Sequence, residues 1–281
     1  MFSLIVCSVD RSDALARLFR SLASQTLRDF EVVLVDQNAD DRLAPLVAQH
    51  AADFPIRHVR SPRGLSRARN AGIAVAERPL IAFPDDDCWY RHETLANAKA
   101  LFSTDDSLDI VTGRTLDAQG QPSVSPSGDR RTTITRQNYL ACGNSNGIFV
   151  KAALLARIGG FDEKLGVGAQ TPFQSGEEAD LLLRAIESGA RLAYVPDLIV
   201  HHDQVVATDN PRRIERAAKY GAGFGALLRK HGFPGTHIAY RLLRPLAGAA
   251  LALARRDLGE VRYKIAWARG IWRGYRDWPK R

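Results

Sequence analysis

The sequence lacks the features of membrane-spanning, secreted and zinc-binding chains. Its 281 residues include only three cysteines, Cys7, Cys88 and Cys142, and none of them has C-x-x-C spacing. We therefore expect reduced, structural thiols and no zinc site. The longest apolar run, residues 245–254, is far shorter than the ~20 residues that a membrane span needs. No basic leader or small-residue cleavage site precedes the first apolar run, which predicts a cytoplasmic protein.

Positive charge is distributed unevenly along the chain. Residues 1–203 contain 22 Lys and Arg against 26 Asp and Glu, whereas residues 204–281 contain 17 against 5. A basic segment usually binds a polyanion, either nucleic acid or an anionic membrane surface, or else it forms a solvated helical face. The acidic balance of residues 1–203 and the lack of a recognised binding motif weigh against nucleic acid.

Strand-like and helix-like segments alternate in the first part of the chain. Short apolar runs rich in β-branched residues predict buried strands, and they lie at residues 2–9, 31–36, 56–59 and 80–83. Strands that alternate with helices predict an α/β fold with a doubly wound, mostly parallel sheet flanked by helices. From residue 210 the pattern is helical almost to the end. We therefore expect a catalytic domain at 1–203 and a basic helical extension at 204–281.

Three consecutive carboxylates, Asp85, Asp86 and Asp87, follow the fourth expected strand. Parallel sheets bind ligands at the carboxyl ends of their strands, so this is where chemistry is expected. In an extended chain, side chains at i and i+2 share a face, which predicts that Asp85 and Asp87 converge while Asp86 points away. Two converging carboxylates need a cation, and Mg²⁺ or Mn²⁺ held on a diphosphate fits them. The alternative is an acidic turn that caps the helix starting near His92.

A second acidic cluster, Glu177, Glu178 and Asp180, begins a helix after a glycine-containing loop. The helix dipole favours carboxylates there, so simple capping is one interpretation. The same position keeps a carboxylate ionised, as a general base must be. The pair His201-His202 closes another extended segment and is a candidate contact for a metal ion or a phosphate.

Asp36 and Arg69 are further polar groups expected at the same edge of the sheet. Asp36 follows the second strand and is suited to accept a hydrogen bond from a nucleobase N–H, whereas Arg69 is suited to stack on or pair with a nucleotide.

Taken in order, these segments resemble glycosyltransferase family 2, the inverting enzymes with the GT-A fold, over residues 1–203. The matching segments are Ser8-Val9-Asp10-Arg11, the strand 31–36 that ends at the family's base-recognising aspartate, Gly-Leu-Ser-Arg-Ala-Arg-Asn-Ala-Gly at 64–72, Phe-Pro-Asp-Asp-Asp at 83–87 in the D-x-D position, Gly-Gly-Phe-Asp-Glu at 159–163, Gly-Glu-Glu-Ala-Asp-Leu at 176–181, and Tyr-Val-Pro-Asp at 194–197 with His202. One departure is Glu178, which stands where the family usually has its catalytic aspartate.

The resemblance implies a single displacement on a nucleotide sugar. Asp87, helped by Asp85 and His202, would hold a divalent metal ion, Mg²⁺ or Mn²⁺, on the diphosphate. Glu178 would remove the proton from the acceptor hydroxyl, with Glu177 or Asp180 as alternatives. The remaining candidates form two groups. The residues expected to bind the nucleotide are Ser8, Asp10, Asp36, Arg69, Asp85 and Asp86, and those expected to meet the acceptor are Trp89, Tyr90, Phe161 and Asp162. Trp89 and Tyr90, which adjoin the acidic triplet, would pack on a sugar ring, with ordinary packing as the alternative.

The expected partners are a nucleotide-sugar donor and a saccharide, lipid-linked or protein acceptor, in surface polysaccharide or glycoconjugate synthesis. The last helical segment has an apolar stripe formed by Val261, Ile265, Ala268, Trp272 and Tyr275. This stripe is suited either to bind the anionic inner face of a membrane or to dock on the catalytic domain. The alternative function is a nucleic-acid-binding or membrane-binding protein on a catalytically inactive, nucleotide-sugar-binding scaffold. A nucleotidyltransferase is disfavoured because residues 8–13 contain no glycine, and the glycines at 221–225 have the wrong spacing for a dinucleotide site.

Overall fold

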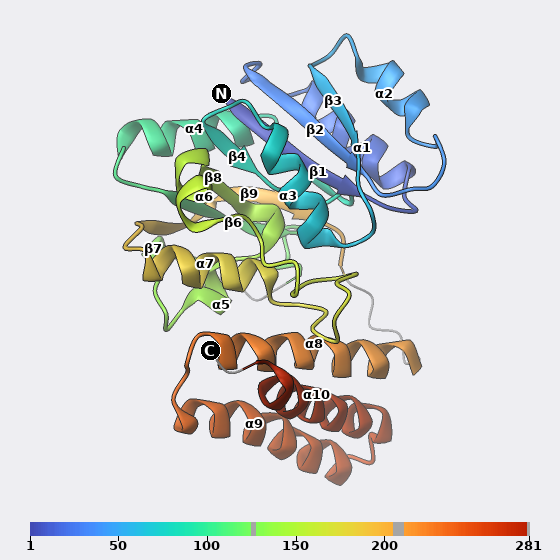
Figure 1. Ribbon diagram of the computed structural model, residues 1–281, viewed down its shortest axis with the longest axis vertical. Helices are drawn as coiled ribbons and strands as arrows, with labels where there is room; N and C mark the ends of the chain where they lie inside the picture. Colours follow the sequence, from blue (N-terminus) through green and yellow to red (C-terminus); the bar gives the residue numbers. More distant parts are fainter. Residues whose placement is uncertain (125–127, 205–210, 280–281) are drawn as a thin grey trace. The chain divides into compact units, whose positions relative to one another are not determined.

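The computed structural model describes residues 1–124, 128–204 and 211–279, and the chain divides into two compact units (Figure 1). The first comprises Met1–Arg63, Arg67–Phe161 and Leu181–Val205, and the second comprises Gly64–Ser66, Asp162–Asp180 and Val206–Arg281. Residues 162–180, assigned from the sequence to the catalytic domain, thus group with the C-terminal helices. The expected boundary at 203/204 adjoins residues 205–210, which lie outside the described residues.

A mixed sheet forms the centre of the first unit, with strand order β3-β2-β1-β4-β8-β6-β9-β5 and with β7 paired to β9. Its longest pairings are parallel, β1 with β2, β2 with β3 and β6 with β9, whereas β8 is antiparallel to both neighbours. The strands are β1 (Phe2–Ser8), β2 (Phe30–Asp36), β3 (Ile56–Arg60), β4 (Leu80–Ala82), β5 (Cys88–Tyr90), β6 (Ile110–Leu116), β7 (Thr132–Thr133), β8 (Ile148–Lys151) and β9 (Leu192–His202). The predicted α/β fold is confirmed.

Helices flank this sheet and bury their apolar faces against it. In α1 the residues at helical spacing, Leu15, Leu18, Phe19 and Leu22, are all buried. Gly72 allows α3 to pack close to β1 and β2, because a Cβ there would lie 3.1 Å from a methyl group of Val35. The helices are α1 (Asp13–Ala23), α2 (Ala44–His50), α3 (Leu65–Val75), α4 (Thr94–Thr104), α5 (Tyr139–Cys142), the 3₁₀ turn η1 (Ser145–Gly147), α6 (Ala152–Ile158) and α7 (Glu177–Glu187).

The second unit contains α8 (Pro211–Lys230), α9 (Gly235–Ala254) and α10 (Leu258–Asp277). Glycines with G-x-x-x-G spacing lie where α8 meets α10. A Cβ on Gly221, Gly225, Gly270 or Gly274 would come within 3.0 Å of the other helix's backbone. The glycine-rich run 221–225 is therefore a surface for close helix packing. No helix among the described residues is long and apolar enough to cross a bilayer.

Candidate active site

The aspartate triplet lies on a tight turn between β4 and β5, at the carboxyl end of β4. The backbone N–H of Cys88 donates to the carbonyl of Asp85 (3.1 Å), so the chain folds back there. The chain is therefore turned at the triplet, not extended as the prediction that Asp85 and Asp87 converge had assumed. Each of the three carboxylates has its own polar partners.

Asp85 is held by Arg69 and Ser145. The Arg69 guanidinium donates to Asp85 Oδ1 (3.2 Å), and the Ser145 hydroxyl donates to Asp85 Oδ2 (3.2 Å). Arg69 itself is almost fully buried and lies over the ring of Phe161, with its guanidinium carbon 5.0 Å from the ring centroid. Burial raises the pKa of Asp85 although the Arg69 charge acts in the opposite direction. Arg69 is therefore a fixed positive charge beside the triplet, at the position where the sequence predicted a nucleotide contact.

Asp87 contacts Arg11 and His202. Its Oδ2 pairs with the Arg11 guanidinium, and its Oδ1 lies 3.2 Å from His202 Nε2. Burial opposes ionisation of Asp87, but the hydrogen bond from His202 and the charge of Arg11 outweigh it and lower the pKa of Asp87. The hydrogen bond to Asp87 in turn raises the pKa of His202. The structure brings together Asp87 and His202, two of the three residues predicted to hold a metal ion.

The antiparallel pairing of β5 with β9 explains this meeting. It places Cys88 opposite His202 and Trp89 opposite His201. His201 Nδ1 lies 3.1 Å from the carbonyl oxygen of Asp117, so the two histidines have different surroundings. Of the pair, His202 is the one beside the acidic turn.

Asp86 is buried and is bound by the end of β1. It accepts hydrogen bonds from the Ser8 hydroxyl (2.8 Å) and from the Arg11 guanidinium (2.9 Å). Burial raises the pKa of Asp86 to about 6, against the hydrogen bond from Ser8 and the charge of Arg11. Ser8 and Asp86, both predicted to bind the nucleotide, thus bind one another and hold the turn against the sheet.

The carboxylates of the turn fit a divalent cation by their chemistry. Among the described residues no three His, Cys, Asp or Glu side chains form a group that could hold a metal ion. However, Asp85 and Asp87 are close enough that the charge of Asp87 raises the pKa of Asp85. Mg²⁺ typically binds through one or two carboxylates and takes its other ligands from water and substrate phosphates. Asp85 and Asp87 match that donor set, with His202 beside them.

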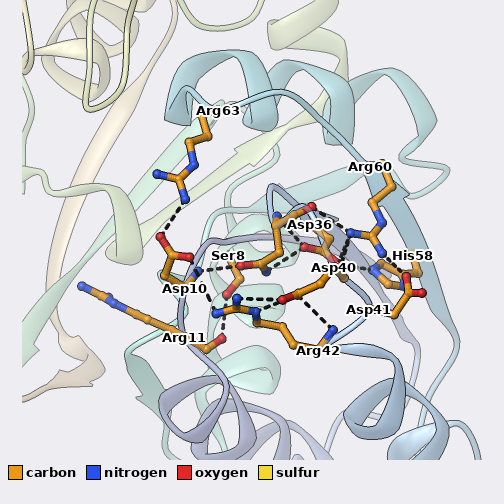
Figure 2. A network of polar contacts seen from close by, with 11 residues as sticks. Ser8, Asp10, Arg11, Asp36, Asp40, Asp41, Arg42, His58, Arg60 and Arg63 are labelled. Carbon is orange, nitrogen blue, oxygen red and sulfur yellow. Dashed lines mark hydrogen bonds and ion pairs between the residues drawn. The ribbon is translucent and has the colours of Figure 1, made fainter.

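Asp36 is at the centre of a polar network at the ends of β1, β2 and β3, which Figure 2 shows. Its side chain is fully buried. Oδ1 accepts from the backbone N–H (2.9 Å) and the side-chain amide (2.8 Å) of Asn38, and Oδ2 lies 3.0 Å from His58 Nε2 and 3.2 Å from Arg60. Burial opposes ionisation of Asp36, but the hydrogen bonds from Asn38 outweigh it, so the pKa of Asp36 is lowered. Because these donors already surround both oxygens, the structure argues against the direct nucleobase contact predicted for Asp36.

Asp10 lies on the outer side of the same network. Its carboxylate pairs with Arg63 (2.8 Å) and lies 3.7 Å from Arg42, and its backbone N–H donates to Asn38 Oδ1 (2.7 Å; Figure 2). Asp10 has a φ of 58°, an uncommon left-handed conformation for a residue other than glycine. Arg42, Arg60 and Arg63 of this network, together with Arg11 beside Asp87, are four guanidinium groups that were not among the predicted site residues. Each lies at or after the carboxyl end of a parallel strand, which was the available signal.

Trp89 and Tyr90, predicted to meet the acceptor, are occupied by packing. Tyr90 is 3% exposed and belongs to the hydrophobic core. The Trp89 ring stacks on His201 (centroids 5.2 Å apart, planes at 12°) and has the Arg17 guanidinium carbon 3.8 Å from its centroid. The structure therefore argues against sugar stacking by either ring, because Tyr90 is buried and Trp89 is already engaged by its two neighbours.

The Gly-Gly-Phe-Asp-Glu loop is fixed by two side chains from distant segments. Asn70 accepts from the backbone N–H of Phe161 (2.7 Å) and donates to its carbonyl (2.9 Å), and Arg184 donates to the carbonyls of Ile158 (2.8 Å) and Gly160 (2.6 Å). The Phe161 ring is 4% exposed and packs edge-on against Phe83, which argues against its predicted acceptor contact.

In the second unit, the acidic first turn of α7 separates into buried and accessible groups. Asp180 is fully buried, and its Oδ1 lies 2.6 Å from Lys230 Nζ and 2.9 Å from His231 Nε2. Lys230 also pairs with Asp162 (2.7 Å), the last of the predicted acceptor residues. Glu177 is 5% exposed, whereas Glu178 is partly exposed. Burial and these ion pairs make Asp180 a structural group and argue against it as the alternative base.

An α/β sheet with carboxylates and guanidinium groups at the carboxyl ends of its parallel strands is the arrangement of a nucleotide-binding enzyme. Residues 3–158, more than half of the chain, match the family described as Glycosyl transferase family 2, and the chain belongs to this family.

Curated relatives match part of their own length. A pre-mycofactocin glycosyltransferase of Mycobacterium tuberculosis is 28% identical over 221 residues, which covers 73% of this chain and 44% of the relative. A PGL/p-HBAD biosynthesis glycosyltransferase of Mycobacterium bovis is 32% identical over 117 residues, which covers 40% of this chain and 46% of the relative. The chain thus spans less than half the length of these two relatives.

Solved structures share the fold. The mannosyltransferase PcManGT from Pyrobaculum calidifontis, in complex with GDP-Man and Mn²⁺, has a TM-score of 0.64 at 20% identity, covering 96% of this chain and 86% of that one. S. aureus TarS 1–349, in complex with UDP-GlcNAc, has a TM-score of 0.63 at 17% identity, covering 96% of this chain and 92% of that one. The GT-A fold predicted from the sequence is confirmed.

Proposed function

We propose that this chain is an inverting, metal-dependent glycosyltransferase that moves a sugar from a nucleoside-diphosphate sugar to an acceptor hydroxyl. The observation that carries the proposal is the turn at the carboxyl end of β4, where Asp85 and Asp87 lie beside Arg69, Arg11 and His202. The complexes of structural relatives with GDP-Man and Mn²⁺ and with UDP-GlcNAc support a donor of this chemistry.

Asp87 and Asp85, with His202 beside them, are the residues that would hold a divalent cation, Mg²⁺ or Mn²⁺. Such a cation supplies positive charge to the diphosphate as it departs. Arg69 adds a fixed guanidinium at the same place, held by Asp85. The Arg11 side chain is half exposed, and its guanidinium is suited to pair with phosphate oxygens.

The nucleoside would meet the network around Asp10. The buried Asp36 carboxylate contacts Asn38, His58 and Arg60 and thereby positions these three side chains. Asp10 is exposed and lies within reach of two arginines. Asp10 is thus the residue of the network best suited to contact the base or the ribose.

Glu178 would be the general base. Of the three acidic side chains that begin α7, it is the one that is not buried. Its position in a first helical turn favours the ionised form. It would take the proton of the acceptor hydroxyl as that oxygen attacks the anomeric carbon opposite the leaving diphosphate, which inverts the configuration.

The test is a screen of UDP-, GDP- and dTDP-sugars with the full chain, with and without Mg²⁺ or Mn²⁺. Nucleoside diphosphate release measures turnover, and thermal stabilisation measures donor binding. Asp87→Asn should lose metal-dependent donor binding and turnover. Glu178→Gln should keep donor binding and lose turnover at least about a hundredfold. Glu187→Gln, at the other end of the same helix and on its surface, is the matched control and should behave as wild type.

Two results would count against these assignments. Full turnover by Glu178→Gln would remove that residue from the role of base. If no nucleotide sugar stabilises or reacts with the chain at any metal concentration, the proposed function itself fails.

A further inference from the structure

The helical unit has an exposed apolar face on α9. Its large apolar side chains, Tyr240, Leu243, Leu246, Leu251 and Leu253, are each 45–63% exposed. Alanines at 239, 247, 250 and 254 are also exposed and lie on the same side of the helix by their spacing. The opposite side, which carries Ile238, Ala249 and Ala252, is buried. An apolar face of this extent usually marks an interaction surface.

This face is not the one that the sequence predicted. The stripe Val261, Ile265, Ala268, Trp272 and Tyr275 belongs to α10, whose Gly270, Ile271 and Gly274 are buried where it meets α8. Of that stripe only Trp272 is exposed by more than half. The candidate docking helix is therefore α9.

The charge around the face indicates its partner. No Asp or Glu occurs between Glu215 and Asp257. Arg244 lies on α9, and Arg255 and Arg256 follow its last turn, and all three are exposed. Leucine and tyrosine on one side of a helix with arginine beside them is the composition of a helix that lies in the plane of a membrane interface. At 20 residues, α9 would extend over about 30 Å of that surface.

We propose that α9 binds an anionic lipid surface through Tyr240, Leu243 and Leu251, with Arg244, Arg255 and Arg256 at the level of the headgroups. A second copy of this chain is the less favoured occupant. Self-pairing through this face would bring a patch with only positive charge against an identical patch, whereas anionic headgroups complement it. The proposal is independent of the proposed function, because lipid binding needs neither donor nor acceptor.

The experiment is co-sedimentation of the full chain with two kinds of vesicle, phosphatidylcholine alone and phosphatidylcholine mixed equally with phosphatidylglycerol. The wild-type chain should sediment with the mixed vesicles, and raising the salt concentration should weaken this binding. Leu243→Gln and Leu251→Gln should each weaken it about tenfold, because each removes one leucine from the lipid interface. Arg244→Gln combined with Arg255→Gln should weaken binding to the mixed vesicles selectively.

The matched control is Val124→Gln, which changes an exposed aliphatic side chain (49% exposed) in the first unit. It should bind vesicles as wild type does. All substituted side chains are exposed, and circular dichroism verifies that the variants fold. Unchanged binding of both leucine variants overturns the proposal, and so does equal binding to the two kinds of vesicle. A leucine variant that converts a dimer to a monomer in light scattering, with no vesicle binding by the wild type, assigns the face to a second copy and also overturns it.

Discussion

Replacing Asp180 with asparagine tests whether this carboxylate is structural or catalytic. Asp180 is fully buried at the start of α7 and faces Lys230 Nζ at 2.6 Å and His231 Nε2 at 2.9 Å, both from the end of α8 and the turn after it. Asparagine keeps the shape of the side chain and removes its charge. We therefore expect Asp180→Asn to destabilise the second unit while leaving the chemistry of sugar transfer intact.

The magnitude follows from the geometry of the ion pair. At 2.6 Å and an effective dielectric constant of about 20, the direct attraction is roughly 6 kcal/mol, most of which offsets desolvation. Removing one partner of a buried pair usually costs about 3–5 kcal/mol. Lys230 keeps its second partner, Asp162, at 2.7 Å. Because of this second partner we expect a smaller loss for Asp180→Asn, about 2–3 kcal/mol, at or below the lower end of that range.

Asp162→Asn is the matched control, since it removes the other carboxylate that Lys230 contacts. The Asp162 side chain is 23% exposed, and Lys230 retains Asp180, so the cost should stay below about 1 kcal/mol. A double-mutant cycle with Lys230→Met then isolates the coupling of Lys230 to Asp180.

Urea unfolding followed by tryptophan fluorescence suits this comparison. Three of the four tryptophans, Trp267, Trp272 and Trp278, lie in α10 or directly after it, so the signal reports mainly on the second unit. With a slope of about 2 kcal/mol/M, the Asp180→Asn midpoint should fall by roughly 1 M. Turnover per folded molecule should stay within about tenfold of wild type. Equal midpoints for wild type and Asp180→Asn would refute the structural role, and a loss of turnover above about a hundredfold without destabilisation would make Asp180 the base.

Three further predictions concern stability and thiol chemistry. Gly274→Ala should lower the free energy of unfolding by about 1–3 kcal/mol, because its Cβ would meet the backbone of α8. Gly248→Ala is the control, since its Cβ meets only the flexible end of a lysine, and it should be neutral or stabilising by up to about 1 kcal/mol. Urea unfolding midpoints measure both. The pKa of Asp86 is raised to about 6, so its neutral form stabilises the metal-free fold below about pH 4, and this contribution is lost as the pH rises through 6. Asp86→Asn, measured by urea unfolding with a chelator present, should flatten this pH dependence and add about 2–3 kcal/mol at neutral pH. Burial raises the pKa of Cys7 to about 12 and the pKa of Cys88 above its ordinary value. In the folded chain at about pH 8, iodoacetamide should therefore alkylate neither thiol, whereas in urea it should alkylate both, as mass spectrometry can measure.

Much of the first unit follows from local sequence pattern. The apolar runs in β1 and β2 are buried almost throughout, and α1 buries the residues that recur at helical spacing. Because such strands alternate with helices, the parallel part of the sheet and its ligand-binding edge could be predicted. That edge does collect Asp87, Arg69 and the network around Asp36.

What the sequence did not reveal depends on contacts between distant segments. The short strand β5 after the triplet exists because it pairs with β9, and this pairing turns Tyr90 into the core and stacks Trp89 on His201. The sequence predicted that Asp36 contacts the nucleobase, but His58 from β3 lies within hydrogen-bonding distance of its Oδ2 atom. The sequence does not reveal a hydrogen-bond partner from a distant segment, because the residue type is the same whether the carboxylate is buried and paired or exposed to solvent.

The positive charge of the chain acts in two different ways. In the first unit, every carboxylate of the acidic turn has a guanidinium partner, since Arg69 pairs with Asp85 and Arg11 is shared by Asp86 and Asp87. These arginines compensate charges that would otherwise repel one another at close range, so the turn can fold before any cation arrives. Asp87 and Asp85 would hold a cation beside Arg11, whose half-exposed side chain would be suited to pair with the phosphates of a donor. In contrast, the exposed Arg244 lies on α9 and the exposed Arg255 and Arg256 follow it, and α9 contains no acidic residue to compensate them. The arginines of the acidic turn are thus paired with its carboxylates, whereas those on and just after α9 are the ones that we propose to meet an anionic surface.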